Sequence, residues 1–257
     1  MKRFLKPHVG LVLIFVAIFW PHFNSVSGLS GALFPETIYQ FNLKIFFDTD
    51  SDVEVNTFLP AENERQEILD ETIIARALEF EEKSGIDGRY ATWRGDEEAN
   101  LIEYSSLLSL QSSRYRLSRE LTIPDDYAEE LQGYLTATQA IPVRHPEIEA
   151  LWDRIKPEQA DNIHDVLQAI YAYNYEQIET LPFKGLTDSL TALRLEAASC
   201  NGKSRLFISL ARLNNLPSRL VGGVILNNKK KKTSHKWVEV FINEHCVQFD
   251  GTNSYFA

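Results

Sequence analysis

Polar and apolar residues alternate in two short stretches near the start of the chain, residues 37–47 and 53–59. A period of two is typical of a strand that buries one face. The polar segment DTDSD between the stretches predicts a turn, so residues 37–60 are predicted to form a β-hairpin. The inward face would consist of Tyr39, Phe41, Leu43, Ile45 and Phe47 in the first strand, and of Val53, Val55, Thr57 and Leu59 in the second.

A different spacing follows in residues 62–83, where apolar residues recur every three or four positions. This spacing predicts a helix that ends at Gly85. Residues 90–93 and 101–110 then predict two more strands across the polar turn DEEAN. Residues 33–122 are therefore expected to form a β-rich N-terminal unit with one helix. The helical positions are Leu69, Ile73, Ile74, Ala77 and Phe80.

Helical patterns dominate the chain beyond residue 123. Asp188 is a candidate N-cap for an additional short helix. The change of pattern predicts an α+β fold, in which the β-rich unit is followed by a second domain over residues 123–257. The amphipathic stripes that predict helices cover residues 125–138, 146–155 and 161–178.

The first 32 residues have the composition of a membrane-targeting segment. A basic start precedes the apolar run 9–20, and no Asp, Glu, Lys or Arg occurs between positions 7 and 35. A helix over the run alone would cover about 18 Å, which is short of the roughly 30 Å hydrocarbon core of a bilayer. A helix continued to about Gly28 would cross it.

Two outcomes of targeting fit residues 1–32. The long uncharged stretch favours an uncleaved signal anchor, and the alternative is a signal peptide that is cleaved after small residues such as Ser25 and Ser27. The positive-inside rule keeps Lys2, Arg3 and Lys6 in the cytoplasm in both cases. The soluble part is therefore predicted to be periplasmic, anchored to the inner membrane or secreted into the periplasm after cleavage.

Composition and charge narrow the classes of partner. A chain of 257 residues, 44% of them hydrophobic, can build a core without metals or disulfides. The net charge of -10 argues against nucleic acid as a partner, because phosphate binding needs a basic face. The only two cysteines, Cys200 and Cys246, are too few for a disulfide scaffold. One disulfide and two free thiols both remain open.

Two charge clusters have plain interpretations. The aspartate-rich segment 48–52 begins like a calcium loop, but Val53 and Leu59 occupy the positions where an EF-hand needs Gly and Glu. It is interpreted as a solvated turn. The basic run at residues 229–232 is interpreted as a solvated loop between strands, with contact to anionic lipid or an acidic partner as the alternative.

The candidate chemistry begins at Cys200. The following residues place apolar side chains on one face of a predicted helix, and Cys200 lies at or just before its start. Unpaired N–H groups and the helix dipole at that position stabilise an anion and lower a thiol pKa. Lys203 and Arg205 add positive charge nearby. The apolar face consists of Leu206, Phe207, Leu210 and Leu213.

A polar turn at Asn243 and Glu244 separates two alternating segments, SHKWVEVFI and CVQFD. An antiparallel pair through this turn would bring His235 and Asp250 together across the ladder, as opposite or diagonal neighbours. A thiol at a helix start, an imidazole and a carboxylate are the nucleophile, base and orienting group of thiol acyl transfer. We therefore expect both residues to meet Cys200.

Four segments around residues 200–253 carry a family resemblance: SCNGKSRLF, LPSRLVGG, SHKWVEVFI and CVQFDGTN. In order and spacing they resemble the core of the transglutaminase-like superfamily. The resemblance implies a papain-like arrangement with a helical half and an antiparallel sheet. It makes Cys200 the nucleophile, His235 the base and Asp250 the orienting residue, with no cofactor and no metal ion.

The whole chain more loosely resembles bacterial inner-membrane proteins in which an N-terminal anchor and a periplasmic transglutaminase-like domain precede several transmembrane helices. Some of those proteins are considered inactive. Here Cys246 replaces the Trp that the family has before its FDP segment, and Gly251 replaces the Pro. The chain stops at Ala257, so we expect either a shortened form of a longer membrane protein or a membrane-protein partner.

The expected function is thiol-dependent acyl transfer or amide hydrolysis on a protein or peptide substrate. The Cys200 thiolate would attack a carbonyl carbon, and an amine or water would resolve the thioester. The backbone N–H of Cys200 is the expected oxyanion donor. The alternative is a catalytically inactive module of the same fold, which binds or senses within a membrane complex.

Two structural alternatives compete for Cys200. A disulfide with Cys246 would silence the thiol, and an oxidising compartment would allow it. A zinc site built from Cys200, His235, His245 and Cys246 is disfavoured, because no ligand pair has finger-type spacing.

Overall fold

The computed structural model describes residues 36–47, 52–85, 88–96, 101–112, 115–182, 185, 187–225 and 233–256. Contacts divide the chain into two compact units, Met1–Ser113 and Arg114–Ala257. This division lies N-terminal to the boundary predicted near residue 123, which rested on a change of pattern alone. The chain is α+β, with antiparallel sheets and helices.

The predicted membrane segment and the basic run at residues 229–232 both lie outside the described residues. Within the described ranges, no helix is long and apolar enough to cross a membrane.

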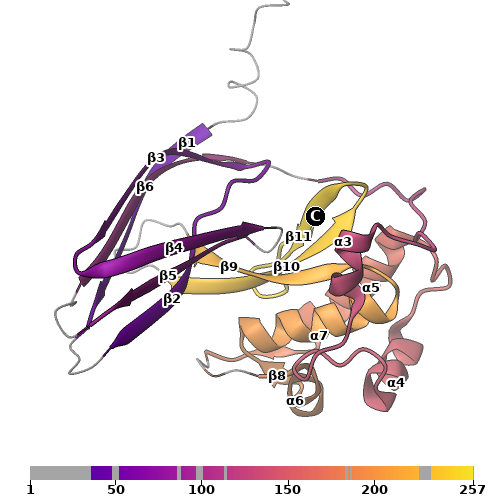
Figure 1. Ribbon diagram of the computed structural model, residues 1–257. Coiled ribbons are helices and arrows are strands. Elements are labelled where there is room, and N and C mark those ends of the chain that lie inside the picture. Colours follow the sequence, from indigo (N-terminus) through magenta and orange to yellow (C-terminus); the bar gives the residue numbers. More distant parts are fainter. Residues whose placement is uncertain are drawn as a thin grey trace, which may run out of the picture. The chain divides into compact units, whose positions relative to one another are not determined.

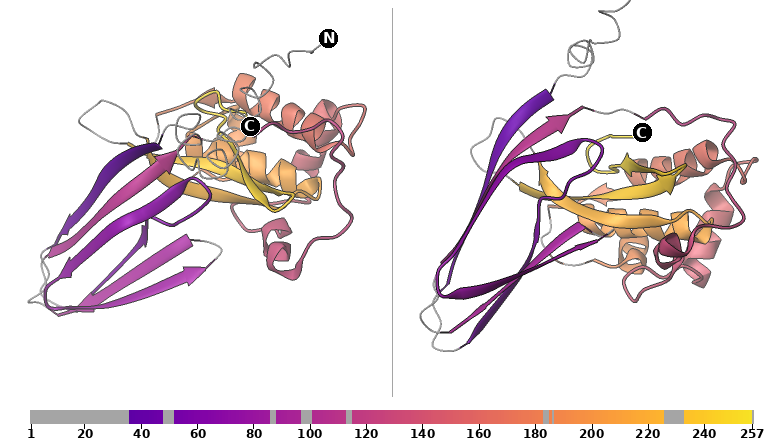
Figure 2. Two further views of the ribbon diagram at one scale, coloured as in Figure 1. Left: turned by 90° about the horizontal axis from the view of Figure 1, so that it is seen from above. Right: turned by 45° about the horizontal axis from the view of Figure 1, so that its top comes forward.

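The first unit consists of two three-stranded antiparallel sheets, with strand orders β1-β6-β3 and β2-β5-β4 (Figure 1). Their inner faces share one buried cluster, in which Trp93 and Tyr104 are the largest side chains. The sheets therefore face each other as the two layers of a sandwich (Figure 2). The strands are β1 (Glu36–Phe46), β2 (Val53–Leu59), β3 (Gln66–Ala75), β4 (Leu78–Gly85), β5 (Gly88–Gly95) and β6 (Leu101–Gln111).

The strands predicted from alternation near the start of the unit are confirmed as β1 and β2. Phe41, Leu43 and Ile45 point inward and pack on the buried cluster. The predicted hairpin is wrong, because β1 pairs with β6 and β2 pairs with β5 in the other sheet. Alternation determines which face of a strand is buried, but it does not identify the strand that pairs along its edge.

The predicted helix over residues 62–83 is also wrong, because this segment forms β3 and β4. The register of β3 shifts between Ile68 and Asp70, and such a bulge moves the alternation by one residue. Leu69 and Ile74 on β3 lie outside, 44% and 42% exposed, whereas Ile73 packs on the buried cluster. Phe80 on β4 is 38% exposed and contacts its ladder partner Trp93. The helix-like spacing therefore combined residues from both faces of two strands.

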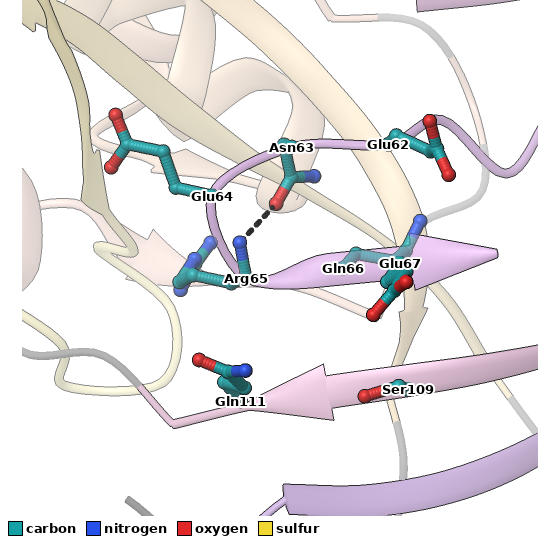
Figure 3. Close-up of a pocket in the computed structure, with 8 residues that line it drawn as sticks. All are labelled: Glu62, Asn63, Glu64, Arg65, Gln66, Glu67, Ser109 and Gln111. Carbon is teal, nitrogen blue, oxygen red and sulfur yellow. Dashed lines mark hydrogen bonds between the residues drawn. The ribbon is translucent and has the colours of Figure 1, made fainter. Parts of the chain in front are cut away.

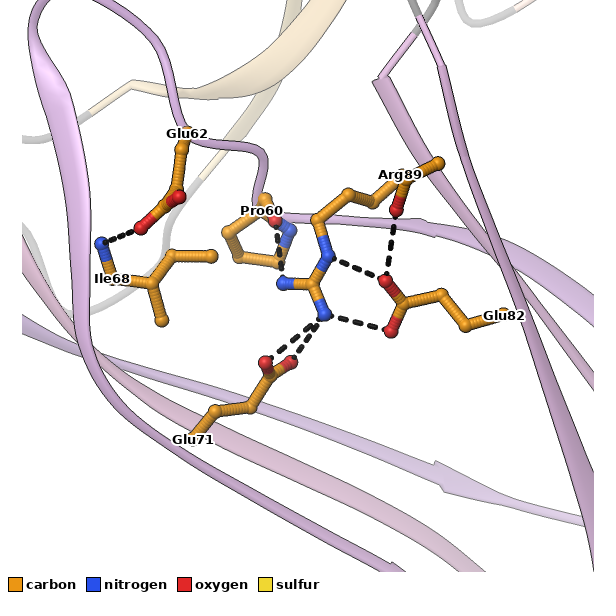
Figure 4. A network of polar contacts seen from close by, with 7 residues as sticks. Pro60, Glu62, Ile68, Glu71, Glu82 and Arg89 are labelled. Carbon is orange, nitrogen blue, oxygen red and sulfur yellow. Dashed lines mark hydrogen bonds and ion pairs between the residues drawn. The ribbon is translucent and has the colours of Figure 1, made fainter.

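An arginine ties the two sheets together at one end of the sandwich (Figure 4). Arg89 on β5 binds Glu82 on the neighbouring strand at 2.7 Å and Glu71 on β3 of the other sheet at 3.0 Å. Its remaining terminal nitrogen donates to the Pro60 carbonyl at 3.0 Å. The hydrogen bonds from Arg89 lower the pKa of Glu82, whereas the ion pair with Glu71 is the one that joins the two sheets.

A surface hollow lies beside the start of β3, between residues 62–67 and the end of β6 (Figure 3). The Asn63 side chain accepts a hydrogen bond from the Arg65 backbone N–H there, at 2.9 Å. Carboxylates and amides line the hollow together with Arg65, without a thiol or an imidazole among the lining residues. It therefore offers no nucleophile of the predicted kind.

The second unit packs helices against a three-stranded antiparallel sheet of order β11-β10-β9 (Figure 1). A short parallel pair joins β7 to β8. The helices are α3 (Glu129–Gln132), the 3-10 helix η1 (Gly133–Leu135), α4 (Pro146–Ile155), α5 (Ile163–Glu176), α6 (Ser189–Leu195) and α7 (Cys200–Leu213). The strands are β7 (Glu179–Thr180), β8 (Ala197–Ala198), β9 (Ser218–Ile225), β10 (Thr233–Ile242) and β11 (His245–Phe249).

Most helices predicted for this unit are confirmed. The Asp188 carboxylate caps α6 by accepting the Thr191 backbone N–H at 2.7 Å. The helix predicted over residues 125–138 shrinks to α3 and η1. Ala128 at its N-cap offers no side-chain hydrogen bond, and none of the residues of either short helix is buried. Neither capping nor packing therefore extends it.

Helix α7 is the centre of the second unit. It runs along one face of the β9–β11 sheet (Figures 1 and 2), and Leu206, Phe207 and Leu210 are buried as predicted. They belong to one cluster with Val238 and Val240 of β10. Each such side chain contributes about 1.5–3 kcal/mol when fully buried, so this contact holds α7 firmly on the sheet.

Candidate active site

Cys200 is the first residue of α7, as the sequence predicts. The chain reaches it from β8 through Ser199, and β8 is held by its parallel pairing with β7. The first turn of α7 packs closely on this approach. A Cβ on Gly202 would lie 2.7 Å from the Ala198 Cβ and 2.9 Å from the Thr187 Cβ. A glycine is therefore required for the helix start to sit where it does.

The environment of Cys200 lowers its thiol pKa. The largest cause is a hydrogen bond with the His235 side chain, and backbone hydrogen bonds at Lys236 and Asn201 act in the same direction. Partial burial opposes them. The group is thus biased toward the thiolate, the nucleophilic form.

The two basic residues expected to assist the thiol have other partners. The Lys203 ammonium is buried and donates to the Ile178 carbonyl at 2.7 Å and to the Thr180 hydroxyl at 3.1 Å. Arg205 donates to the Thr187 carbonyl at 3.0 Å. Both side chains hold the segments around the start of α7 instead of lowering the thiol pKa directly.

His235 lies near the start of β10 and is 7% exposed. Its Nε2 is 2.7 Å from Asp250 Oδ2, so we assign the contact with Cys200 to Nδ1. Hydrogen bonds with Asp250 and then with Cys200 raise the pKa of His235 to about 9, against the opposing effect of burial. The imidazolium therefore persists at neutral pH beside the thiolate.

Asp250 directly follows β11, whose last ladder pair is Val238 with Phe249. Continuing that register makes Asp250 a diagonal neighbour of His235, as expected. Burial raises the Asp250 pKa, but hydrogen bonds from His235, from Asn253 and from the Thr252 backbone outweigh it, so the pKa is lowered overall. The carboxylate is thus ionised opposite the imidazole.

The structure adds Asn253 to this group, which the sequence did not single out. Its side-chain Nδ2 donates to Asp250 Oδ2 at 2.8 Å and lies 3.0 Å from His235 Nε2. The signal available in the sequence was only its place in FDGTN, at the end of the last segment of the resemblance.

Trp237 flanks the imidazole on the same strand. The two rings stack with centroids 6.3 Å apart at 26°. Gly223 of β9 pairs with His235 in the ladder, and a Cβ on it would lie 2.5 Å from Cη2 of the indole. The glycine in LVGG therefore makes room for the ring that restricts His235.

Of the two departures from the family pattern, Gly251 has a local explanation. A Cβ on Gly251 would lie 2.5 Å from Asn174 Oδ1, so the glycine accommodates the buried Asn174 side chain. Cys200 and Cys246 are not joined in a disulfide, and Cys246 Sγ accepts a hydrogen bond of 4.0 Å from a terminal nitrogen of Arg219. In the part of the chain that the structure describes, no group of three or more His, Cys, Asp or Glu is placed to hold a metal ion.

Residues 149–251 match the family model of the transglutaminase-like superfamily. A crystal structure from Cytophaga hutchinsonii, provisionally described as a cysteine protease, aligns with a TM-score of 0.68 at 18% identity, over 86% of this chain and 79% of that one. The fold is thus shared with that protein.

Two structures of the periplasmic domain of TgpA from Pseudomonas aeruginosa align less well. Their TM-scores are both 0.40, at 13% and 12% identity, over 83% and 80% of this chain and 77% and 72% of those chains. No curated protein matches the sequence. The match to the family model, over residues 149–251, lies within the second unit.

Gly202→Ala should displace the start of α7, because the added Cβ would lie under 3.0 Å from the Cβ atoms of Ala198 and Thr187. Overpacking of this kind costs about 1–3 kcal/mol. We expect urea unfolding to show that loss and iodoacetamide to label Cys200 more slowly. Gly133→Ala is the matched control, since nothing lies within 4 Å of its Cβ position. Equal unfolding free energies for the two variants would contradict the tight packing.

Proposed function

We propose that this protein is a transglutaminase-like thiol enzyme that transfers the acyl group of a protein or peptide amide to an amine or to water. One observation carries the proposal. Cys200 hydrogen-bonds with His235, and the opposite edge of that imidazole lies 2.7 Å from Asp250. A lowered thiol pKa beside a raised imidazole pKa is the signature of a thiolate–imidazolium pair.

The proposed reaction follows from these positions. The Cys200 thiolate attacks the amide carbonyl carbon, and the His235 imidazolium gives its proton to the departing amine. This leaves a thioester on Cys200 and a neutral imidazole. His235 then takes a proton from the incoming amine or water, which attacks the thioester and releases Cys200. Asp250 holds the imidazole tautomer throughout.

The start of α7 supplies the stabilisation of the oxyanion. The backbone N–H of Cys200 belongs to the first turn, where helix N–H groups have no partner within the helix. It is therefore the proposed donor to the tetrahedral oxyanion. The helix dipole acts in the same direction on both the thiolate and the oxyanion.

We also propose an extracytoplasmic location, with the inner membrane as the contact of the N-terminal segment and a membrane protein as partner. The support is the basic start followed by an uncharged stretch that reaches position 35.

Alkylation of Cys200 tests the ion pair. Peptide mass spectrometry separates Cys200 from Cys246. In the wild type, iodoacetamide should react well below the free-thiol pKa of about 8.5, because His235 stays protonated up to about pH 9. Above that pH the imidazolium is lost, and the thiolate remains without its partner. His235→Ala should titrate near 8.5. If Cys200 titrates near 8.5 in both proteins, the proposed ion pair is contradicted.

Acyl transfer itself is tested with a glutamine-containing peptide and a labelled primary amine. We expect amide product or ammonia release from the wild type and from Cys246→Ala. Cys200→Ala should lose at least about 1,000-fold of the rate, as removal of a nucleophile does. If peptide libraries yield no turnover although Cys200 alkylates as predicted, the inactive binding module is the better description.

A fusion of residues 1–32 to alkaline phosphatase tests the location. The fusion should be enzymatically active, because that enzyme folds only where its disulfides form. Carbonate extraction then separates an anchor, which stays with membranes, from a cleaved signal peptide. An inactive fusion of normal abundance would place the chain in the cytoplasm.

A further inference from the structure

The Asp250 carboxylate accepts more hydrogen bonds than a pairing with one imidazole requires. Oδ1 accepts the backbone N–H groups of Thr252 at 2.9 Å and Asn253 at 3.2 Å. Oδ2 accepts from His235 at 2.7 Å and from the Asn253 side chain at 2.8 Å. Four donors therefore fix the rotation of a side chain that is only 15% exposed.

The Asn253 amide and the His235 imidazole share one oxygen. Nε2 of His235 lies 2.7 Å and Nδ2 of Asn253 lies 2.8 Å from Asp250 Oδ2, and the two nitrogens are 3.0 Å apart. When Nε2 carries a proton, both nitrogens therefore donate to Oδ2. A carboxylate is a stronger acceptor than a ring nitrogen. In the neutral imidazole the proton is therefore directed to Nε2, and Nδ1 is left to face Cys200.

The loop that carries Asn253 has a fixed shape. Asp250 and Tyr255 exchange two backbone hydrogen bonds, of 2.9 and 3.2 Å, which close the turn. The next residue, Phe256, packs edge-on against Tyr171 and Phe249, with ring centroids 5.3 Å away in each case. The amide of Asn253 is thus held in place before any substrate arrives.

We propose that Asn253 is a positioning residue of the thiol site, whose amide holds Asp250 Oδ2 on His235 Nε2 and so fixes the imidazole tautomer that faces Cys200. This inference rests on the proposed function, because it assigns Asn253 a role in forming the same thiolate–imidazolium pair. The titratable groups around Asp250 are His235, Lys203 of α7 and Tyr171 of α5. None of them can replace an amide that donates without changing charge.

The test compares wild type, Asn253→Ala and Asn253→Asp in the pH dependence of Cys200 alkylation, followed by peptide mass spectrometry from pH 5 to 10. In Asn253→Ala, Asp250 Oδ2 loses one of its two donors, so the carboxylate is held less firmly on His235 and the ion pair weakens. The apparent thiol pKa should rise toward 8.5, with about tenfold slower labelling at pH 6, the effect typical of losing one hydrogen bond to a charged group.

Asn253→Asp keeps the shape of the side chain and tests the donor. Two carboxylates this close hold one proton between them at low pH, and that proton can donate to Asp250 Oδ2. We expect wild-type labelling near pH 5 and a fall to the Asn253→Ala profile as the proton is lost. This pH-dependent rescue would not arise from a residue that only stabilises the fold. If Asn253→Ala fails to fold, the pH profile of Asn253→Asp alone tests whether Asn253 acts as a donor to Asp250.

Asn42→Ala, an exposed change on β1, is the matched control and should label like the wild type. A free-thiol titration of the wild type overturns the proposed function and this inference together. A wild type with a lowered thiol pKa, joined by an unchanged profile in the two Asn253 variants, overturns the role of Asn253 alone.

Discussion

The hydrogen bond between His235 and Asp250 is the contact on which the rest of the site depends. It requires β10 and β11 to pair in one register, because a slip by a single residue would turn one of the two side chains to the other face. It also requires a fixed turn after Phe249, and Gly251 permits that turn to approach Asn174. Asn174 in turn donates to the Lys203 carbonyl at 2.8 Å. A continuous set of contacts therefore joins the carboxylate to the helix that carries Cys200.

The position of Cys200 also depends on a buried charged side chain, Lys203 of α7. The buried Lys203 ammonium costs desolvation, and burial accordingly lowers its pKa. Two hydrogen bonds, to the Ile178 carbonyl between α5 and β7 and to Thr180 of β7, offset part of this cost. Removing one partner of such a group is expensive, since the other is left unsatisfied. The arrangement therefore locks β7, and with it β8 and the start of α7, at some expense of stability.

The two units reach stability by different means. The second unit buries a large apolar cluster around α7. The first buries a smaller cluster between two sheets and adds the ion pair of Arg89 with Glu71, which crosses between them. The Arg89 side chain is 15% exposed, so its ion pairs are partly shielded from solvent. Such pairs contribute more to folding stability than fully exposed ones, which contribute little. The proposed site lies in the unit with the larger core, where His235 is 7% exposed.

The sequence by itself determined the features that rest on local patterns. Cys200 at a helix start, the Asp188 cap, the inward faces of β1 and β2, and the diagonal placement of His235 and Asp250 all follow from spacing within a few residues of each other or across one short turn. Tertiary structure alone decided the partners of β1 and β2, the bulge at Leu69, the burial of Lys203 and the contact of Asn253 with two site residues. These depend on strands and helices that are distant in sequence, and a local pattern contains no information on which distant segment satisfies a given hydrogen bond.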